Sequence, residues 1–351
     1  MTDGRSCTEA HEPFLERNLT MLKYTIKRVL QLIPVLIGVV VVIFTINYVT
    51  GMDKAVINVL ISTNKATAEV IAAKEHELGL DRPYLIQLLD YFWNLIAHGS
   101  MGTSYVQHRE VTFLIGQRIG NTVRIGLGAA LLSTIVGVPL GIVAAVKQNT
   151  VMDYISTFFA TLTAALPSFW LCLIFMRFFC VKLQWLPLTG VATWKGYILP
   201  ILATGLMPIA MTMRMTRSSM LEVVRQDYIR TARAKGVPEK KVVLRHILQN
   251  SMVPVVTTIG MNLGQSMTGS VIAETIFNIN GLGNLMSTSI MNHDTVTVQG
   301  CVLICAFIIS GMNLLTDLAY AAIDPRIRAQ YSSSGKKRSR KTKKQKEVAA
   351  A

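Results

Sequence analysis

Long stretches without Asp, Glu, Lys or Arg recur along the chain, and they restrict its possible folds more than any other feature. Six of them approach the roughly 20 residues that cross the hydrocarbon core of a bilayer. They cover residues 29–50, 125–146, 154–176, 196–213, 252–273 and 295–316. Because lipid offers the backbone no hydrogen-bonding partner, each stretch is predicted to be a helix. The sequence therefore predicts an all-α integral membrane protein with six transmembrane helices.

The composition argues against an ordinary soluble enzyme and against a nucleic-acid-binding domain. Hydrophobic residues make up 51% of the 351 residues and charged residues only 16%, whereas an average soluble domain carries about 25% charged residues. The formal net charge of +15 is concentrated at one end, because eight Lys and Arg between Lys336 and Lys346 are followed by a single acid, Glu347. That tail contributes +7, so no nucleic-acid partner is predicted.

The distribution of Lys and Arg between the spans predicts the orientation of the chain. With the N-terminus inside, the inner segments include nine basic residues between Arg214 and Arg245, whereas the outer segment 275–293 has no Lys or Arg. The long outer segment 52–121 is nearly balanced, with six basic and seven acidic residues. Because Lys and Arg near span ends resist translocation, both termini are expected in the cytoplasm.

Three parts are predicted along the chain: a polar cytoplasmic leader at 1–22, a transmembrane domain at 23–331 and a basic disordered tail at 332–351. Within the transmembrane domain, the outer loop at 52–121 is much longer than the usual connection between helices. It is therefore expected to fold locally, with helical stretches at 66–78 and 84–97.

The cytoplasmic segment at 216–251 is long and charged, and its pattern predicts two helices joined by a tight turn. The first helix is expected over 219–235 and the second over 238–249. Gly236 suits the C-terminal cap of the first helix, and Pro238 suits the first turn of the second. Small residues near the turn would let the surface of a partner approach the helix backbone. A helix lying on the membrane surface is the simpler alternative, but it does not explain the tight turn.

The sequence lacks motifs for catalysis or nucleotide binding. It contains no Gly-x-x-x-x-Gly-Lys-[Ser/Thr] phosphate cradle, so the chain is not expected to hydrolyse ATP by itself. Its cysteines and histidines lack the spacing of metal ligands, so no metal site is expected. Arg177, Glu274 and Asp317 fall near span ends and are interpreted as interfacial charges, not as the groups of a proton- or sodium-coupled carrier. Energy for transport would then come from another subunit.

The cytoplasmic segment resembles a known family. Residues 227–236, Asp-Tyr-Ile-Arg-Thr-Ala-Arg-Ala-Lys-Gly, are similar to the coupling loop of ATP-binding-cassette importer permeases, above all those of the dipeptide/oligopeptide/nickel branch. Arg230 stands where the broader family has Glu, as it does in that branch. Further motifs of the branch follow in order, among them Gly79-Leu80-Asp81-Arg82-Pro83, Gly102-Thr103-Ser104-Tyr105, Leu166-Pro167-Ser168-Phe169-Trp170, Glu274-Thr275-Ile276-Phe277 and Asp324-Pro325-Arg326-Ile327-Arg328.

The resemblance implies the type I permease fold of these importers, and it implies partners. Two ATPase subunits would bind the ATP and Mg, since this chain is expected to hold no cofactor of its own. A second homologous permease subunit, an extracytoplasmic binding protein that meets the outer loop, and the lipid bilayer complete the set. The residues implied to dock in an ATPase groove are Asp227, Tyr228, Arg230, Thr231, Ala232, Arg233, Ala234, Lys235 and Gly236.

The implied function is that of a permease subunit of an ATP-driven importer in a prokaryotic cytoplasmic membrane, forming the path for dipeptides or oligopeptides. Nickel or another chelated metal is the alternative cargo within the branch. His76, His98 and His108 of the outer loop lack ligand spacing, which favours peptides. From a different class, the alternative is a channel or membrane scaffold whose cytoplasmic helix recruits some other partner.

Overall fold

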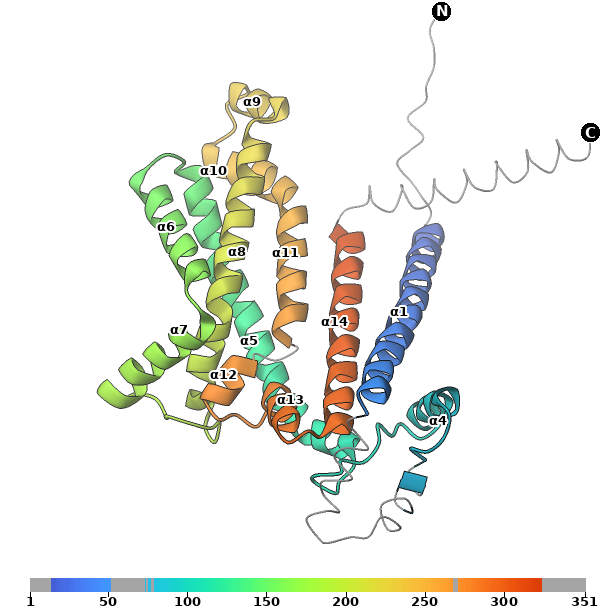
Figure 1. The fold of residues 1–351 in the computed structure, drawn as a ribbon. Coiled ribbons are helices and arrows are strands. Elements are labelled where there is room, and N and C mark those ends of the chain that lie inside the picture. The colour runs from blue at the N-terminus through green and yellow to red at the C-terminus, as the bar shows by residue number, and fades with distance from the viewer. Residues whose placement is uncertain (1–13, 52–72, 74, 77–78, 268–270, 324–351) are drawn as a thin grey trace, which may run out of the picture. The chain divides into compact units, whose positions relative to one another are not determined.

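Helices account for most of the residues that the structure, a computed structural model, describes, namely 14–51, 73, 75–76, 79–267 and 271–323 (Figure 1). The chain divides into two compact units. Leu36–Asn313 forms the larger unit, and the described residues on either side of it belong to the smaller one. In the smaller unit, Arg28 and Asp317 form an ion pair of 3.0 Å. α1 (Phe14–Thr50) and α14 (Thr295–Ile323) each contribute residues to both units, and the clusters and pockets described below lie in the larger one.

Four of the helices in the described part of the chain are long and apolar enough to cross a membrane. They are α1 (Phe14–Thr50), α5 (Val111–Val146), α8 (Ile198–Val224) and α14 (Thr295–Ile323). These helices contain the first, second and sixth of the predicted spans, and α8 contains all of the fourth except its first two residues. The number of candidates rises to five if α6 and α7 together form one span. The total of six spans and the side on which the termini lie stay predictions.

The third predicted span, 154–176, is not the single straight helix that was expected. α6 (Val151–Ala165) is bent by 102° relative to the helical segment Ser168–Lys182, which begins with α7 (Ser168–Phe175). The bend falls at Pro167, whose ring disfavours a helical conformation of the residue before it. Leu166 is accordingly extended, with φ −80° and ψ 132°.

The fifth predicted span, 252–273, corresponds to α11 (Gln249–Met267) and the beginning of α12 (Val271–Ile276). α11 is not among the helices that are apolar enough to be candidates on their own. It packs against α5 and α8, and Asn262 on it is buried and donates to the Thr212 hydroxyl at 3.3 Å. A helix that other helices cover in this way can carry polar groups that lipid would not accept.

Glycines allow α5 to approach its neighbours closely. A Cβ atom at Gly141 would lie 2.7 Å from the carbonyl oxygen of Met213 on α8, and one at Gly126 would lie 2.7 Å from that of Ser266 on α11. Small residues at helix contacts let backbones approach and are the usual solution where packing, not water exclusion, holds helices together. α5, α8 and α11 therefore form the closely packed centre of the bundle.

Two groups of short helices lie at opposite ends of this bundle (Figure 1). α9 (Asp227–Ala234) and α10 (Glu239–Lys241) lie at one end. α4 (Tyr84–Ala97), α12 and α13 (Leu282–Met291) lie at the other. The helix predicted over 84–97 is therefore confirmed with the same bounds. The structure separates the segment expected in the cytoplasm from the segments expected outside.

Some predicted parts differ from the structure or lie beyond what it describes. α1 begins at Phe14, inside the expected polar leader 1–22. The helix of the first span thus extends several turns farther toward the N-terminus than predicted. Residues 1–13, the basic tail 332–351 and most of the helix predicted over 66–78 lie outside the described residues.

The orientation predicted from the Lys and Arg distribution implies a clear pattern of chemical labelling. In a cysteine-free background, a membrane-impermeant thiol reagent applied to intact cells should label a cysteine at Gln107 and not one at Gln226. Both side chains are exposed and lie on segments at opposite ends of the bundle. Ser104 and Ser219, natural choices from the sequence, are only 1% and 7% exposed and would resist the reagent. Permeabilised cells should label both positions, and a reversed pattern in intact cells would invert the topology.

Candidate functional site

The segment at 216–251 forms a helical hairpin, but its boundaries differ from those predicted. α8 runs on to Val224, where the chain turns because Gln226 is extended, with φ −74° and ψ 145°. α9 begins only at Asp227. The single helix expected over 219–235 is therefore wrong, and its first part belongs to the long helix α8.

The turn after α9 agrees with the prediction. Gly236 has a φ of +73°, and its N–H donates to the carbonyl oxygen of Arg233 at 3.0 Å. Apart from Gly236 itself and its two chain neighbours, no described residue has an atom within 4 Å of a Cβ atom placed there. The left-handed backbone conformation, and not a shortage of room, is thus what favours glycine. We call α9, this turn and α10 the α9 hairpin (residues 227–241).

The second predicted helix, 238–249, is present but does not end where expected. Pro238 stands directly before the first turn of α10. A π-helical stretch, Val242–Leu248, then joins α10 to α11. The α9 hairpin is therefore connected through helical structure to the centre of the bundle on both sides, by α8 and by α11.

One buried apolar residue anchors α9 to the rest of the chain. Ile229 is 0% exposed and packs in a cluster with Met220 of α8, with Val242 and Ile247 of the π-helical stretch, and with Ala145 at the end of α5. Burying an isoleucine side chain contributes about 1.5–3 kcal/mol. Ile229 was not among the predicted site residues, although a lone apolar residue in a charged helix was a signal that could have identified it.

The structure leaves most of the predicted docking residues accessible. Asp227, Tyr228, Arg230, Thr231, Arg233, Ala234, Lys235 and Gly236 are exposed, whereas Ala232 is half-buried against the anchoring cluster. Their side chains present positive charge, small residues and one aromatic ring. The hairpin thus exposes a compact basic surface on a fixed backbone, which is a geometry suited to docking in a groove of another protein.

An ion pair fixes the two arms of the hairpin. The Arg233 guanidinium donates to both carboxylate oxygens of Glu239, at 2.7 and 3.1 Å. The guanidinium lowers the pKa of the Glu239 carboxyl below its usual value. Both side chains are exposed, so the pair adds little stability. The pair instead sets the relative position of the two arms of the hairpin. The sequence prediction did not include this intramolecular partner of Arg233.

A second, largely buried ion pair lies near the same end of the bundle. Asp153, at the start of α6, is 2% exposed and accepts hydrogen bonds from Arg217 of α8 at 2.6 and 2.8 Å. It also accepts one from the backbone N–H of Asn149 at 3.0 Å. The α5–α6 connection is thereby tied to the part of α8 that leads into the hairpin. The pairing joins residues 64 positions apart, so no local sequence pattern indicates it.

At the opposite end of the bundle, a buried carboxylate joins two distant segments. Asp294 is 1% exposed and accepts from the hydroxyls of Ser104, at 2.5 Å, and Thr297, at 2.6 Å. Ser104 lies in the motif Gly102-Thr103-Ser104-Tyr105 and is itself 1% exposed. This bond holds the segment after α4 against the first turn of α14.

Glu274 has the same kind of structural role, which corrects its interpretation as an interfacial charge. Its side chain is 0% exposed. Its carboxylate accepts from the Thr122 hydroxyl of α5 at 2.8 Å and from the backbone N–H of Asn284 at 3.0 Å. The Asn284 N–H belongs to the first turn of α13, where a negative charge is favourable. Glu274 therefore links α12 and α13 to α5.

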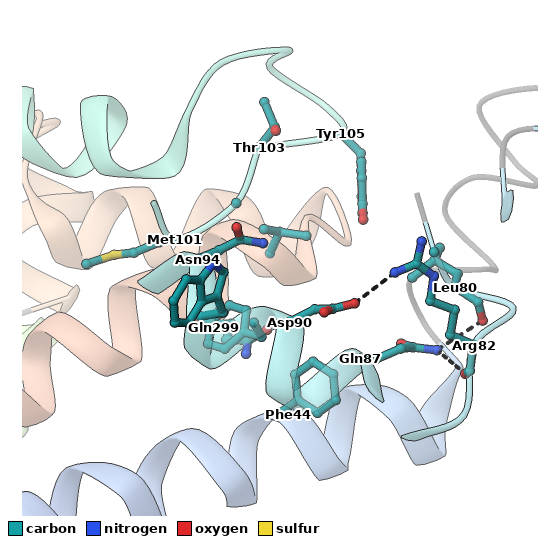
Figure 2. A pocket seen from close by; sticks show the side chains of 15 residues that line it. Phe44, Leu80, Arg82, Gln87, Asp90, Asn94, Met101, Thr103, Tyr105 and Gln299 are labelled. Atoms are coloured by element: carbon teal, nitrogen blue, oxygen red, sulfur yellow. Dashed lines mark hydrogen bonds and ion pairs between the residues drawn. The ribbon is translucent and has the colours of Figure 1, made fainter. Parts of the chain in front are cut away.

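A pocket of about 480 Å³ lies at this end of the bundle. Its walls come from the C-terminal end of α1, from α4 and the turn before it, from residues 101–105 and from the first turns of α14 (Figure 2). Figure 2 shows an ion pair beside Gln87, in which the Arg82 Nη1 and Asp90 Oδ2 atoms are 2.9 Å apart. Gln87 donates to the carbonyl oxygens of Leu80 and Arg82 and so holds the turn before α4 in place.

Four helices of membrane-spanning length and apolar composition, two of which pack together at the centre of the bundle, define this chain as a multi-pass membrane protein. A sequence model for the inner membrane component of binding-protein-dependent transport systems matches residues 137–329, and one for the N-terminal part of such components matches residues 21–126. The chain belongs to this family, as an importer permease of the peptide branch of ATP-binding-cassette transporters, located in the bacterial inner membrane.

This chain aligns with almost the entire length of two relatives. The glutathione transport system permease protein GsiC of Salmonella typhi is 40% identical over 311 residues, which are 88% of this chain and 99% of the relative. The dipeptide transport system permease protein DppB of Alkalihalophilus pseudofirmus is 37% identical over 336 aligned residues, covering 88% of this chain and 100% of the relative.

A solved structure shares the fold. A chain of the MetNI methionine ABC transporter, in an inward-facing conformation, superimposes with a TM-score of 0.53 at 14% identity. The match covers 61% of this chain and 97% of that chain. The predicted fold of an importer permease is thereby confirmed, while family membership in general implies ATPase and binding-protein components as partners.

Proposed function

We propose that this chain is the permease subunit of an ATP-driven peptide importer and that the α9 hairpin is the element that docks to an ATPase subunit. The full-length match to permeases named for glutathione and dipeptide transport supports the peptide cargo. The observation that carries the docking assignment is the combination of an exposed basic surface with the buried anchor Ile229 beneath it. A docking element must be accessible and must also transmit force without deforming.

The same end of the bundle offers a recess beside the hairpin. A cavity of about 430 Å³ is lined by Arg217, Ser218, Leu221, Glu222, Arg225 and Gln226, all near the end of α8. A side chain of the ATPase would fit there while the hairpin enters the groove of that subunit. The proposed complete transporter contains two ATPase subunits, a second homologous permease and an extracytoplasmic binding protein that meets the outer loop.

The structure suggests how docking is converted into movement of the membrane helices. α8 has 27 residues, so at 1.5 Å per residue it is about 40 Å long. It leads directly from the hairpin into the packed centre formed with α5 and α11. When ATP brings the two ATPase subunits together, the two docked hairpins approach each other and α8 acts as a lever. The permease pair then changes from inward-facing to outward-facing.

Peptide cargo is tested by uptake in cells that lack their own peptide importers. Cells that express the complete transporter should accumulate a radiolabelled dipeptide in an ATP-dependent manner, and should not accumulate nickel. Cells that express the transporter without this chain serve as the control. Uptake of nickel with no uptake of peptide would assign the chain to the metal-transporting systems instead.

The purified chain is predicted to have no ATPase activity of its own, because its sequence contains no phosphate-binding loop. The measurement is phosphate release by the chain in lipid nanodiscs, before and after addition of the ATPase subunits. Release should be indistinguishable from a protein-free blank until those subunits are added. Turnover by the isolated chain that survives removal of contaminating ATPases would contradict the proposed division of labour.

A further inference from the structure

The pocket at the α4 end of the bundle contains two buried polar groups that have no hydrogen-bonding partner in the described part of the chain. Gln299 on α14 is 6% exposed, and its Oε1 atom accepts from the Asn47 amide of α1 at 3.2 Å. Its Nε2 amide has no hydrogen-bonding partner among the described residues, and neither has the hydroxyl of Tyr91. Folded proteins leave few buried polar groups unpaired, so two in one pocket call for an explanation.

Both unpartnered groups are hydrogen-bond donors. The Asn47 bond takes the oxygen of the Gln299 side chain, so its NH₂ group is the part that remains available. The Tyr91 hydroxyl carries its proton at physiological pH, as an ordinary tyrosine does, and burial raises its pKa further, to about 12. Two buried donors are best satisfied by a ligand that presents acceptor oxygens, such as peptide carbonyls or a carboxylate.

The remaining walls add apolar surface and charge. Phe44, Tyr91 and Trp93 supply aromatic faces, and the Arg82–Asp90 pair supplies one charge of each sign. A short peptide matches this combination, because it carries carbonyl oxygens, apolar side chains and two oppositely charged ends. The pocket volume of about 480 Å³ lies within the range of about 300–1,000 Å³ typical of small-ligand sites.

The pocket is held in shape by contacts that do not involve a ligand. The hydroxyls of Thr45 on α1 and Tyr84 on α4 are 2.8 Å apart, and the rings of Phe44 and Tyr91 lie 5.8 Å apart. On the other side, the bond from Ser104 to Asp294 fixes the segment that contains residues 101–105. A pocket that is already ordered needs less ordering when a ligand binds.

We propose that this pocket is a peptide-binding subsite of the permease, separate from the α9 hairpin, in which the Gln299 amide and the Tyr91 hydroxyl donate to carbonyl or carboxylate oxygens of a free short peptide. The inference rests on the proposed function, because it takes the cargo to be a peptide. A free peptide of two or three residues can lie entirely inside the pocket. A loop of the binding protein suits it less well, because the two chain segments that flank the loop would both have to pass through the opening.

The test is a titration of the full-length chain in lipid nanodiscs with the dipeptide alanyl-phenylalanine. Trp93 is 68% exposed and lines the pocket, so its fluorescence reports binding. Gln299→Met removes the donor and should weaken binding by about tenfold or more. Asn47→Ala breaks the same Asn47–Gln299 bond but keeps the donor, and should bind within about twofold of the unchanged chain. Trp93→Phe is the control for the readout, because the fluorescence change should disappear in this variant if it comes from Trp93.

Tyr91→Phe separates a binding role from a structural one. The hydroxyl has no partner among the described residues, so its removal should leave the melting temperature unchanged or raised while binding of the dipeptide falls several-fold. A residue with a purely structural role would show the opposite pattern. Equal binding by Gln299→Met, Tyr91→Phe and the unchanged chain would overturn the proposal even if one variant folded poorly.

The remaining outcomes distinguish this proposal from the proposed function. If the complete transporter imports peptides but the unchanged chain gives no saturable signal, the subsite is refuted and the function stands; water or another part of the chain then serves the two donors. If Gln299→Met weakens only the attachment of peptide-free binding protein, a protein loop is the occupant and the proposal is again refuted. If no peptide is imported, the proposed function itself is wrong.

Discussion

Gly236→Pro is expected to abolish ATP-driven peptide uptake and the stimulation of ATPase activity by cargo-loaded binding protein, while the subunits still assemble. Proline fixes φ near −65°, whereas the backbone at Gly236 has φ +73°. It also removes the N–H that donates to Arg233. The two arms of the α9 hairpin then cannot keep their relative direction, so the hairpin should no longer seat in the ATPase groove.

Gly51→Pro is a matched control for this change. Gly51 follows α1, has φ +60°, and donates its N–H to the carbonyl oxygen of Asn47 at 3.1 Å. The substitution therefore imposes the same backbone conflict and loses the same kind of bond far from the hairpin. Uptake per assembled transporter should stay within about twofold of the unchanged protein. Normal coupling in Gly236→Pro would remove the basis for assigning the docking site to this hairpin.

Glu274→Ala is expected to have the second large effect, a loss of about 3 kcal/mol or more in the free energy of unfolding. The substitution leaves the Thr122 hydroxyl and the Asn284 N–H without their acceptor. A buried donor left unpaired, such as the Thr122 hydroxyl, costs about 1–3 kcal/mol, and the lost bond of the half-buried Asn284 N–H and the void left by the side chain add to that cost. Thermal unfolding in detergent should show a lower melting temperature, and less chain should be extracted in native form.

Two further variants make this result specific. Glu110→Ala removes an exposed carboxylate near the same end of the bundle and should change stability by no more than about 0.5 kcal/mol. Glu274→Gln keeps the shape and one acceptor oxygen, so its loss should be smaller than that of Glu274→Ala. A Glu274→Ala protein as stable as Glu110→Ala would mean that the buried carboxylate does not hold α12 and α13 to α5.

The membrane class and the positions of its best-defined elements follow from local sequence. Apolar runs of membrane-spanning length specify helices because lipid permits little else. α4 was predicted with its observed bounds, since Pro83 precedes a strongly amphipathic stretch. The turn at Gly236 was also predicted, because a glycine after a charged helix is a local signal for a left-handed cap. Such features depend on residues that are neighbours in the chain.

The helix boundaries of the segment proposed to dock were predicted in outline only, and its docking role stays a prediction. The residues of the α9 hairpin were named from their resemblance to a family, and most of them prove to be exposed. The break at Gln226 was missed, because nothing in the helical pattern of residues 219–235 signals it. The anchoring role of Ile229 was missed as well, since it depends on the packing of α8 and the π-helical stretch around it.

By itself, the sequence determined that this chain is a helical membrane protein with a charged hairpin between two of its predicted spans. Only the tertiary structure decided which polar residues are buried and paired. Glu274 meets Thr122 across 152 positions, Ser104 meets Asp294 across 190, and Gln299 meets Asn47 across 252. Local patterns carry no information about such pairs, because the free energy of burying a polar group depends on the partner that folding brings to it.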